Sequence, residues 1–166
     1  AGLANGRAVP DHGDGDGGFP VLRLTALKDG RIDLRERKVG AWDQNAASNF
    51  LVEQGDILVS RGNGSKKLVG LGGLVDGAPD PVAYPDTMIR IPLALSAVDA
   101  EWFLQVWNSA SMRAQIEAAA KTTAGIYKIN QGDIENFMVP VPPIAEQIEI
   151  ATLVRERMAL LICAET

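Results

Sequence analysis

A single stretch decides the fold of this chain: Gly55-Asp56-Ile57-Leu58-Val59-Ser60-Arg61-Gly62-Asn63-Gly64-Ser65. Its first two residues form a turn pair, and the apolar, partly β-branched residues 57–59 predict a buried strand. From Arg61 onward, glycines alternate with polar residues, and lysines follow at positions 66 and 67. Glycine at that density disfavours regular structure. We therefore predict a buried strand that ends in a mobile, basic loop, residues 61–67.

Further strands are predicted on both sides of this one. Residues 68–75 are expected to return as its partner strand, with the glycines of residues 70–73 marking bulges or a close approach of the backbone. Residues 19–24 and 88–92 also have strand character, and Asp29-Gly30 is predicted as a turn. The fold class that follows is α/β (mixed), a single domain with a curved mixed β-sheet and flanking helices.

A pair of helices follows the strands. Ser96 is predicted to cap the first helix, along which Trp102 and Trp107 recur at helical spacing. These two aromatic residues are interpreted as core residues rather than as a platform for stacking bases. Asn108-Ser109 is expected to break this helix, and a second helix carries Met112.

The C-terminal part is predicted to end in a helix for a partner. Residues 122–125 suit a loop and residues 126–129 a short strand, whereas the prolines of residues 137–143 enforce an extended segment. The predicted boundary lies there: a domain of residues 1–142 precedes a helix of residues 143–166. Its apolar residues recur at steps of three and four, close to a coiled-coil seam. They are Ile148, Ala151, Val154, Met158 and Leu161.

Composition limits the chemistry available to the chain. It has 166 residues with one cysteine, Cys163, and one histidine, His12. This excludes an internal disulfide and a structural zinc site, and the low cysteine content favours a reducing cytoplasm. No apolar run is long enough to cross a bilayer. The Asp- and Gly-rich residues 11–18 are interpreted as a solvated loop, because the third acidic position and the closing glutamate of a calcium loop are missing. No metal or cofactor is expected.

Catalytic motifs are absent from the sequence. There is no Gly-x-Ser-x-Gly elbow, no Asn/Asp-Pro-Pro-aromatic tetrapeptide and no complete phosphate-binding loop. Asp133-Ile134-Glu135 comes nearest to a nuclease metal motif but lacks the lysine that would complete it. We therefore expect a binding module rather than an enzyme.

Charge is distributed unevenly along the chain. The formal net charge of −5 argues against nucleic acid as a partner. The basic residues, however, gather in three clusters, within residues 31–38, 61–67 and 121–128, while both ends of the chain are acidic. Loops of this kind can meet phosphates without a basic isoelectric point.

Several motifs resemble those of one protein family. The stretch 55–65 resembles the strand and loop of the target-recognition domains in type I restriction-modification specificity subunits. Residues 139–148, Val-Pro-Val-Pro-Pro-Ile-Ala-Glu-Gln-Ile, are similar to the border between such a domain and its spacer helix. Between them lie further similar fragments: Asp99, Phe103-Leu104, Trp107-Asn108-Ser109, Arg113, Ile116, Thr123-Ala124-Gly125, Ile129-Asn130 and Ile134. Their order and spacing make the resemblance specific.

The resemblance implies a DNA-reading role within a larger complex. In that family each subunit carries two recognition domains, and each domain reads one half of a bipartite site in double-stranded DNA. Paired spacer helices dock modification subunits, which methylate adenine, and a restriction subunit cleaves unmodified DNA. This chain departs from the pattern by holding one recognition domain and the start of one spacer helix. Pairing with a second copy and belonging to a longer subunit are both open.

Two loops are the predicted DNA contacts. Arg61 suits the acceptors of guanine and Asn63 those of adenine, while Ser65, Lys66 and Lys67 suit phosphates. The residues assigned to DNA binding are Arg61, Asn63, Gly64, Ser65, Lys66, Lys67, Lys121, Thr122, Thr123, Tyr127 and Lys128. Arg35, Arg37 and Lys38 form a third cluster, for which an exposed hairpin face is the preferred interpretation.

Two alternatives stay open. One is a recognition domain of a fused restriction-methyltransferase, in which catalysis lies elsewhere in a longer chain. The other is a protein-interaction module that reuses the fold and does not bind DNA. Only DNA binding through phosphates would weaken as the salt concentration rises.

Overall fold

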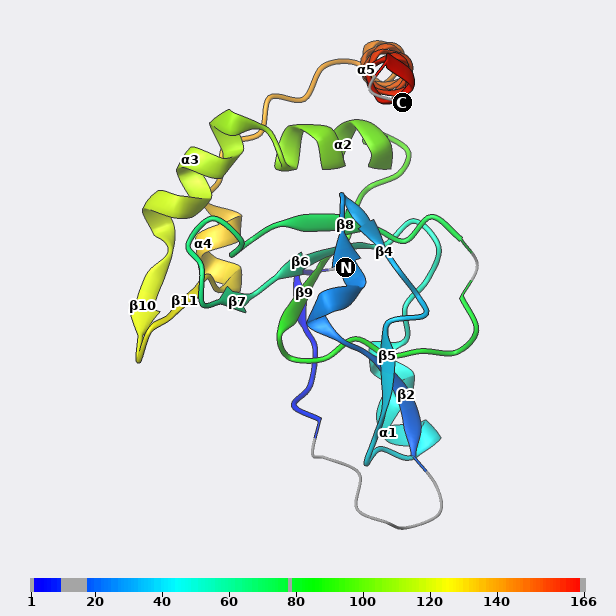
Figure 1. Cartoon of the computed structure of the whole chain (residues 1–166), viewed down its shortest axis with the longest axis vertical. Coiled ribbons are helices and arrows are strands. Elements are labelled where there is room, and N and C mark those ends of the chain that lie inside the picture. Colours follow the sequence, from blue (N-terminus) through cyan, green and yellow to red (C-terminus); the bar gives the residue numbers. More distant parts are fainter. Residues whose placement is uncertain (1, 10–17, 78, 165–166) are drawn as a thin grey trace.

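The computed structural model describes residues 2–9, 18–77 and 79–164, and its largest element is a six-stranded sheet (Figure 1). The strand order is β1-β9-β6-β8-β4-β3, in which β4 and β8 run parallel and all other neighbours are antiparallel. The sheet is mixed, as predicted. Its strands are β1 (Ala4–Asn5), β3 (Leu27–Lys28), β4 (Arg31–Ile32), β6 (Ile57–Ser60), β8 (Gly72–Leu74) and β9 (Met88–Ile91).

Two small sheets accompany the large one. One has the order β10-β11-β7, and the other pairs β2 with β5. Their strands are β2 (Phe19–Leu22), β5 (Arg37–Gly40), β7 (Gly62–Asn63), β10 (Lys121–Thr123) and β11 (Ile126–Lys128). The predicted loop 122–125 is therefore partly wrong, because residues 121–123 form a strand and only Ala124 and Gly125 make the turn.

The helices include three that matter for the site. They are α2 (Ala100–Trp107), α3 (Ala110–Ala119) and α5 (Ile144–Ala164); the shorter ones are η1 (Leu24–Ala26), α1 (Gln44–Ala47), η2 (Ser48–Phe50) and α4 (Gln131–Glu135). The predicted break at Asn108-Ser109 is confirmed, since Asn108 ends α2 and Ser109 caps α3. The prediction that Ser96 caps the first helix is wrong. Ser96 lies in a turn, and the Asp99 carboxylate accepts the Trp102 amide at 2.8 Å.

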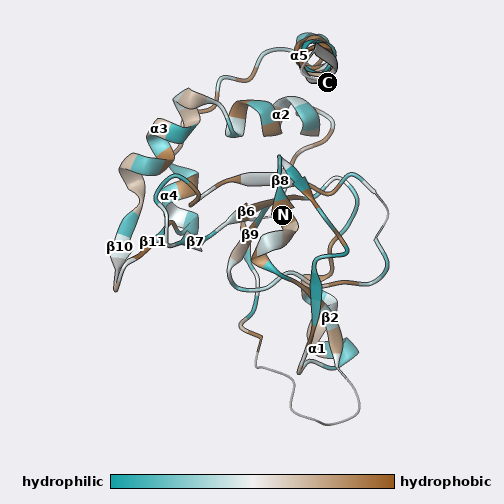
Figure 2. Cartoon of the chain, in the orientation of Figure 1, coloured by the Kyte–Doolittle hydropathy of each residue, from teal (hydrophilic) through white to brown (hydrophobic). Residues whose placement is uncertain are grey.

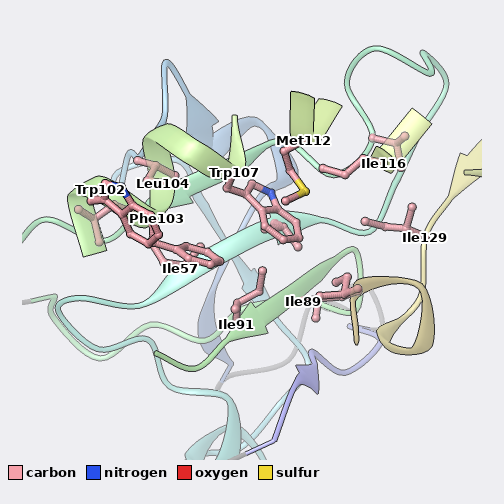
Figure 3. Packing of buried hydrophobic residues seen from close by; sticks show 14 of the residues in the cluster. Ile57, Ile89, Ile91, Trp102, Phe103, Leu104, Trp107, Met112, Ile116 and Ile129 are labelled. Carbon is pink, nitrogen blue, oxygen red and sulfur yellow. The ribbon is translucent and has the colours of Figure 1, made fainter. Parts of the chain in front are cut away.

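The main core lies between α2–α3 and one face of the large sheet. Trp102 and Trp107 are both 2% exposed and pack toward Ile57 and Ile91, as Figure 3 shows. Their interpretation as core residues is confirmed. Burying side chains of this size is the main stabilising contribution to such a domain. Leu58 of the same strand packs in a second cluster with Leu22 and Met88, so β6, which ends in the basic loop, is buried on both faces.

The C-terminal helix begins after the proline-rich segment, as predicted. Residues 137–143 have no regular structure, and α5 starts at Ile144. Gln147 is fully buried, and its side-chain amide bonds the backbone of Asp99, Ala97 and Pro142 at 2.7–2.9 Å. Figure 1 places α5 beyond α2, at the outer edge of the molecule. The start of the helix is thus fixed to the domain by a satisfied polar group.

The remaining predictions about the chain concern its ends and its surface. The segment interpreted as a solvated loop falls within residues 10–17 except for Gly18, and so lies outside the described residues. Among the helices that the structure describes, none combines the length and apolarity needed to cross a membrane. Within the same residues, no three His, Cys, Asp or Glu side chains gather in a way that could hold a metal ion.

Candidate DNA interface

The small sheet β10-β11-β7 brings the two predicted DNA-binding loops together. Asn63 of β7 pairs with Tyr127 of β11, and Gly62 pairs with Lys128. On its other side β11 pairs with β10, which places Lys128 opposite Lys121. Residues separated by about 60 positions in the sequence therefore form one continuous surface, seen at one side of Figure 1 below α3.

The β10–β11 hairpin is tightly turned and exposed. Ala124 and Gly125 both have positive φ, 51° and 79°, as a two-residue hairpin turn of the right twist requires. The side chains of Lys121, Thr122 and Lys128 are exposed, and that of Tyr127 is half-buried. Cationic and hydroxyl groups that can contact phosphates thus project from a short, ordered hairpin.

Arg61 stands where the large sheet passes into the small one. Its amide donates to the carbonyl of Thr87 at 2.8 Å, and its carbonyl accepts the amide of Ile129. The half-buried guanidinium donates through Nη1 to the carbonyl of Asp86 at 3.3 Å. Within the part of the chain that the structure describes, this long bond engages one of the five guanidinium donors, so most of the fork that would recognise a guanine is available.

The loop after Arg61 is shaped by its own polar groups. The Asn63 side-chain oxygen accepts the Ser65 amide at 2.9 Å, and the Ser65 carbonyl accepts the Leu68 amide at 3.0 Å. Gly64 and residues 65–67 are exposed. Pairing with adenine would need both the oxygen and the nitrogen of the Asn63 side chain. Because Oδ1 already accepts the Ser65 amide, the Asn63 side-chain oxygen is used within the loop, and the side-chain nitrogen is the atom that stays available.

Helices α2 and α3 hold the chain that returns from this loop. The Trp107 indole donates to the carbonyl of Gly70 at 2.8 Å, and the Asn108 amide makes two bonds to Gly72, both at 2.9 Å. Arg113 donates to the carbonyls of Val69, Lys67 and Lys66. The residues 66–72 are thereby fastened to the helix pair at several successive positions.

The role of Arg113 was not predicted from the sequence. Its acceptors lie 44 to 47 positions away, so no local pattern indicates them. Burial lowers the pKa of the Arg113 guanidinium, and Glu117 at 3.8 Å opposes that effect. The only sequence signal was the place of Arg113 among the residues that carry the family resemblance.

Both arginines of the third basic cluster lie beside acidic residues. Arg35 bonds Asp33 at 2.8 and 2.9 Å, and Arg37 lies 3.9 Å from Asp80. The hydrogen bonds from Arg35 lower the pKa of Asp33 to about 2. These pairs fit the preferred interpretation of an exposed hairpin face.

The predicted partner seam of α5 is exposed except at one residue. Ile148, Val154, Met158 and Leu161 are 40–60% exposed, and Figure 2, which views this outer helix end-on, shows that it carries both hydrophobic and hydrophilic residues. Ala151, by contrast, is buried in the main core and its carbonyl accepts the Gln105 amide. The assignment of Ala151 to a partner interface is therefore wrong, because that side of the helix packs on its own domain.

Comparisons with known proteins agree on one family. The chain is 31% identical over 143 residues to the type I restriction enzyme EcoKI specificity subunit of Escherichia coli (strain K12), a match that covers 86% of this chain and 31% of that protein. It is 31% identical over 140 residues to the StySPI specificity subunit of Salmonella potsdam, covering 84% and 30% of the two chains. The chain spans about a third of the length of these curated relatives.

Solved structures show the same fold. The HsdS subunit of Thermoanaerobacter tengcongensis matches with a TM-score of 0.63 at 16% identity, covering 99% of this chain and 37% of that one. The chain fits a target-recognition domain of a type I specificity subunit. No family model matches the sequence. The mixed α/β fold with a C-terminal helix, predicted from the sequence, is thus confirmed.

Proposed function

We propose that this domain reads one half of a bipartite site in double-stranded DNA and thereby directs adenine methylation by modification subunits. The observation that carries the proposal is the β10-β11-β7 sheet, which joins the two basic loops into one exposed surface. Similarity to specificity subunits supplies the class of partner. A restriction subunit would join the same complex and cleave unmodified sites.

The residues of this surface divide into two roles. Arg61 reads a guanine with its guanidinium fork, and Asn63 donates to a base acceptor, because both lie where the loop leaves the rigid sheet. Ser65, Lys66 and Lys67 contact phosphates, as do Lys121, Thr122, Thr123, Tyr127 and Lys128 of the hairpin. Gly64 leaves room for the backbone to approach DNA. Because the net charge is −5, modification subunits supply much of the affinity for DNA.

The test assembles this chain with candidate modification subunits and exposes the complex to a randomised duplex pool with methyl donor. Sequencing the methylated molecules should yield a recurring motif that contains methylated adenine. A palindromic bipartite motif would indicate two copies of this chain. If modification subunits that are active with another specificity subunit methylate nothing here, a protein-interaction module becomes the better interpretation.

Two variants separate base reading from phosphate contact. Arg61→Ala should reduce the preference at one position of the motif by about 1–3 kcal/mol, and Arg61→Lys should not restore it, because an ammonium lacks the planar fork. Lys67→Ala should weaken binding to all sequences alike and lower the salt dependence, the slope of log K against log salt, by about 0.9. If both variants keep the native motif, rate and salt slope, the assignment of this loop is wrong.

The exposed seam of α5 is proposed to pack against a helix of a second copy or of a second recognition half, and to dock modification subunits. Met158 and Leu161 are 54% and 60% exposed, and Met158 borders the groove between α5 and the domain, which Arg31 and Leu104 also line. Met158→Glu with Leu161→Glu should abolish assembly while leaving the unfolding of the domain unchanged. Arg157→Gln is the matched surface control. An assembled complex of the double variant would exclude this seam.

A further inference from the structure

The guanidinium of Arg113 donates hydrogen bonds to several backbone carbonyls of the turn that carries Lys66 and Lys67. Arg113 of α3 donates through Nη1 to the carbonyl of Val69 at 2.7 Å, and through Nη2 to the carbonyls of Lys67 at 3.1 Å and Lys66 at 3.4 Å. Its side chain is only 14% exposed. A charged, buried donor that faces several carbonyls forms strong hydrogen bonds, so the three acceptors are held in one arrangement.

The turn itself has weak internal support. Ser65 accepts both the Leu68 amide at 3.0 Å and the Val69 amide at 3.3 Å, and Leu71 donates to Leu68 at 3.4 Å. These are long or shared bonds, whereas the chain just beyond the turn is fastened by Trp107 to Gly70 at 2.8 Å. Arg113 therefore acts at the place where the loop changes from a free surface to a packed strand.

The direction of the two lysines depends on this backbone. Lys66 and Lys67 expose their side chains while their carbonyls face Arg113, which is held between them and the core of the domain. A long, flexible lysine can reach a phosphate only within the range that its backbone position allows. A shift of the turn would thus displace both phosphate contacts together and change the register of the neighbouring Arg61 and Asn63 on DNA.

We propose that Arg113 is a positioning residue that sets the presentation of Lys66 and Lys67 to the DNA backbone without touching DNA itself. This inference rests on the proposed function. It assigns specificity to a residue of the helix pair rather than of the contact surface. It also separates geometry from charge, since a lysine at position 113 would keep the positive charge but could not bridge the three carbonyls.

Whether Arg113 stabilises the turn of residues 66–69 is tested on this chain without DNA. Hydrogen exchange of the amides of Leu68 and Val69 should become about tenfold faster or more in Arg113→Gln and in Arg113→Lys, because the turn opens without its external donor. Amides of β6 and α2 should keep their protection, which shows that the domain stays folded. The matched control, Glu117→Gln, removes the acid 3.8 Å from Arg113 and should leave exchange in the turn unchanged.

The consequence for DNA is tested in the complex with modification subunits on the randomised duplex pool. With either Arg113 variant, the preference for the best base should fall by about tenfold at one or more positions of the half-site, the effect of one displaced base contact. Glu117→Gln should reproduce the wild-type motif.

The outcomes distinguish the inference from the function on which it rests. A wild-type complex that methylates without sequence preference contradicts the proposed function itself. A wild-type motif that both Arg113 variants retain contradicts only the positioning role. An Arg113→Lys complex with the wild-type motif and normal exchange in the turn shows that charge alone suffices, and also overturns the inference.

Discussion

Glycines before and after the 66–69 turn occupy opposite environments. A Cβ on Gly64 would meet nothing within 4 Å, whereas a Cβ on Gly70 would lie 2.6 Å from Ile116 and one on Gly72 would lie 2.7 Å from Trp107. The second group is required by packing, because α2 and α3 lie directly on that part of the chain. Gly64, by contrast, has space around it that only solvent or a partner can fill, whereas a Cβ on Gly62 would lie 3.3 Å from Lys128. One glycine-rich stretch therefore contains a structural half and a half that is open to a ligand.

The largest expected effect comes from filling the packed half. Gly70 has φ +71°, so Gly70→Ala adds both backbone strain and a collision with Ile116. We expect the free energy of unfolding to fall by about 2–5 kcal/mol, the combined cost of a left-handed residue and an overpacked core. Urea unfolding followed by tryptophan fluorescence measures it.

Gly77→Ala is the matched control, since a Cβ there meets nothing within 4 Å. It should change the free energy of unfolding by less than about 0.5 kcal/mol. A loss below about 1 kcal/mol for Gly70→Ala would show that the helices can move away from the strand, and that the packed half is less constrained than its contacts indicate.

A smaller effect should follow from removing one of the bonds that hold this half. Trp107→Phe keeps an aromatic ring against Phe103, whose centroid lies 5.7 Å away, but removes the indole donor to the buried Gly70 carbonyl. We expect a loss of about 1–3 kcal/mol, the cost of an unpaired buried acceptor together with lost ring volume. An unfolding curve that matches the wild type would mean that water replaces the indole donor.

Local sequence signals predicted the elements that depend on their own residues. The apolar residues 57–59 indicated β6, the spacing of Trp102 and Trp107 indicated a core helix, and the prolines before Ile144 indicated the start of α5. In each case the periodicity or the backbone restriction acts within a few residues. The predicted strand 68–75 was too long, because the helix pair holds residues 66–70 in a turn and leaves Gly72–Leu74 for β8.

Long-range contacts account for what the sequence did not predict. Residues 121–123 have the polarity of a loop and become β10 only because β11 pairs with them and in turn with β7. The same pairing unites two loops that were predicted as separate contact surfaces. The surroundings of Arg113 and Ala151 likewise depend on hydrogen-bond partners 44 or more positions away in the sequence. The local sequence pattern thus indicated the candidate residues but not the β10-β11-β7 sheet that brings them together.

The smallest effect on stability, and the sharpest test of the comparison, is expected at Gly64. Gly64 has no positive φ and open space around it, so Gly64→Ala should change the free energy of unfolding by less than about 0.5 kcal/mol. The added methyl group would nevertheless stand on the surface that we propose approaches DNA, and we expect methylation of the selected motif to slow. For Gly70→Ala we expect the opposite: the free energy of unfolding should fall, and any loss of methylation should follow from that lost stability. If Gly64→Ala leaves both stability and methylation unchanged, the open half of the stretch is ordinary solvated surface, and the DNA contacts must be sought on the β10–β11 hairpin instead.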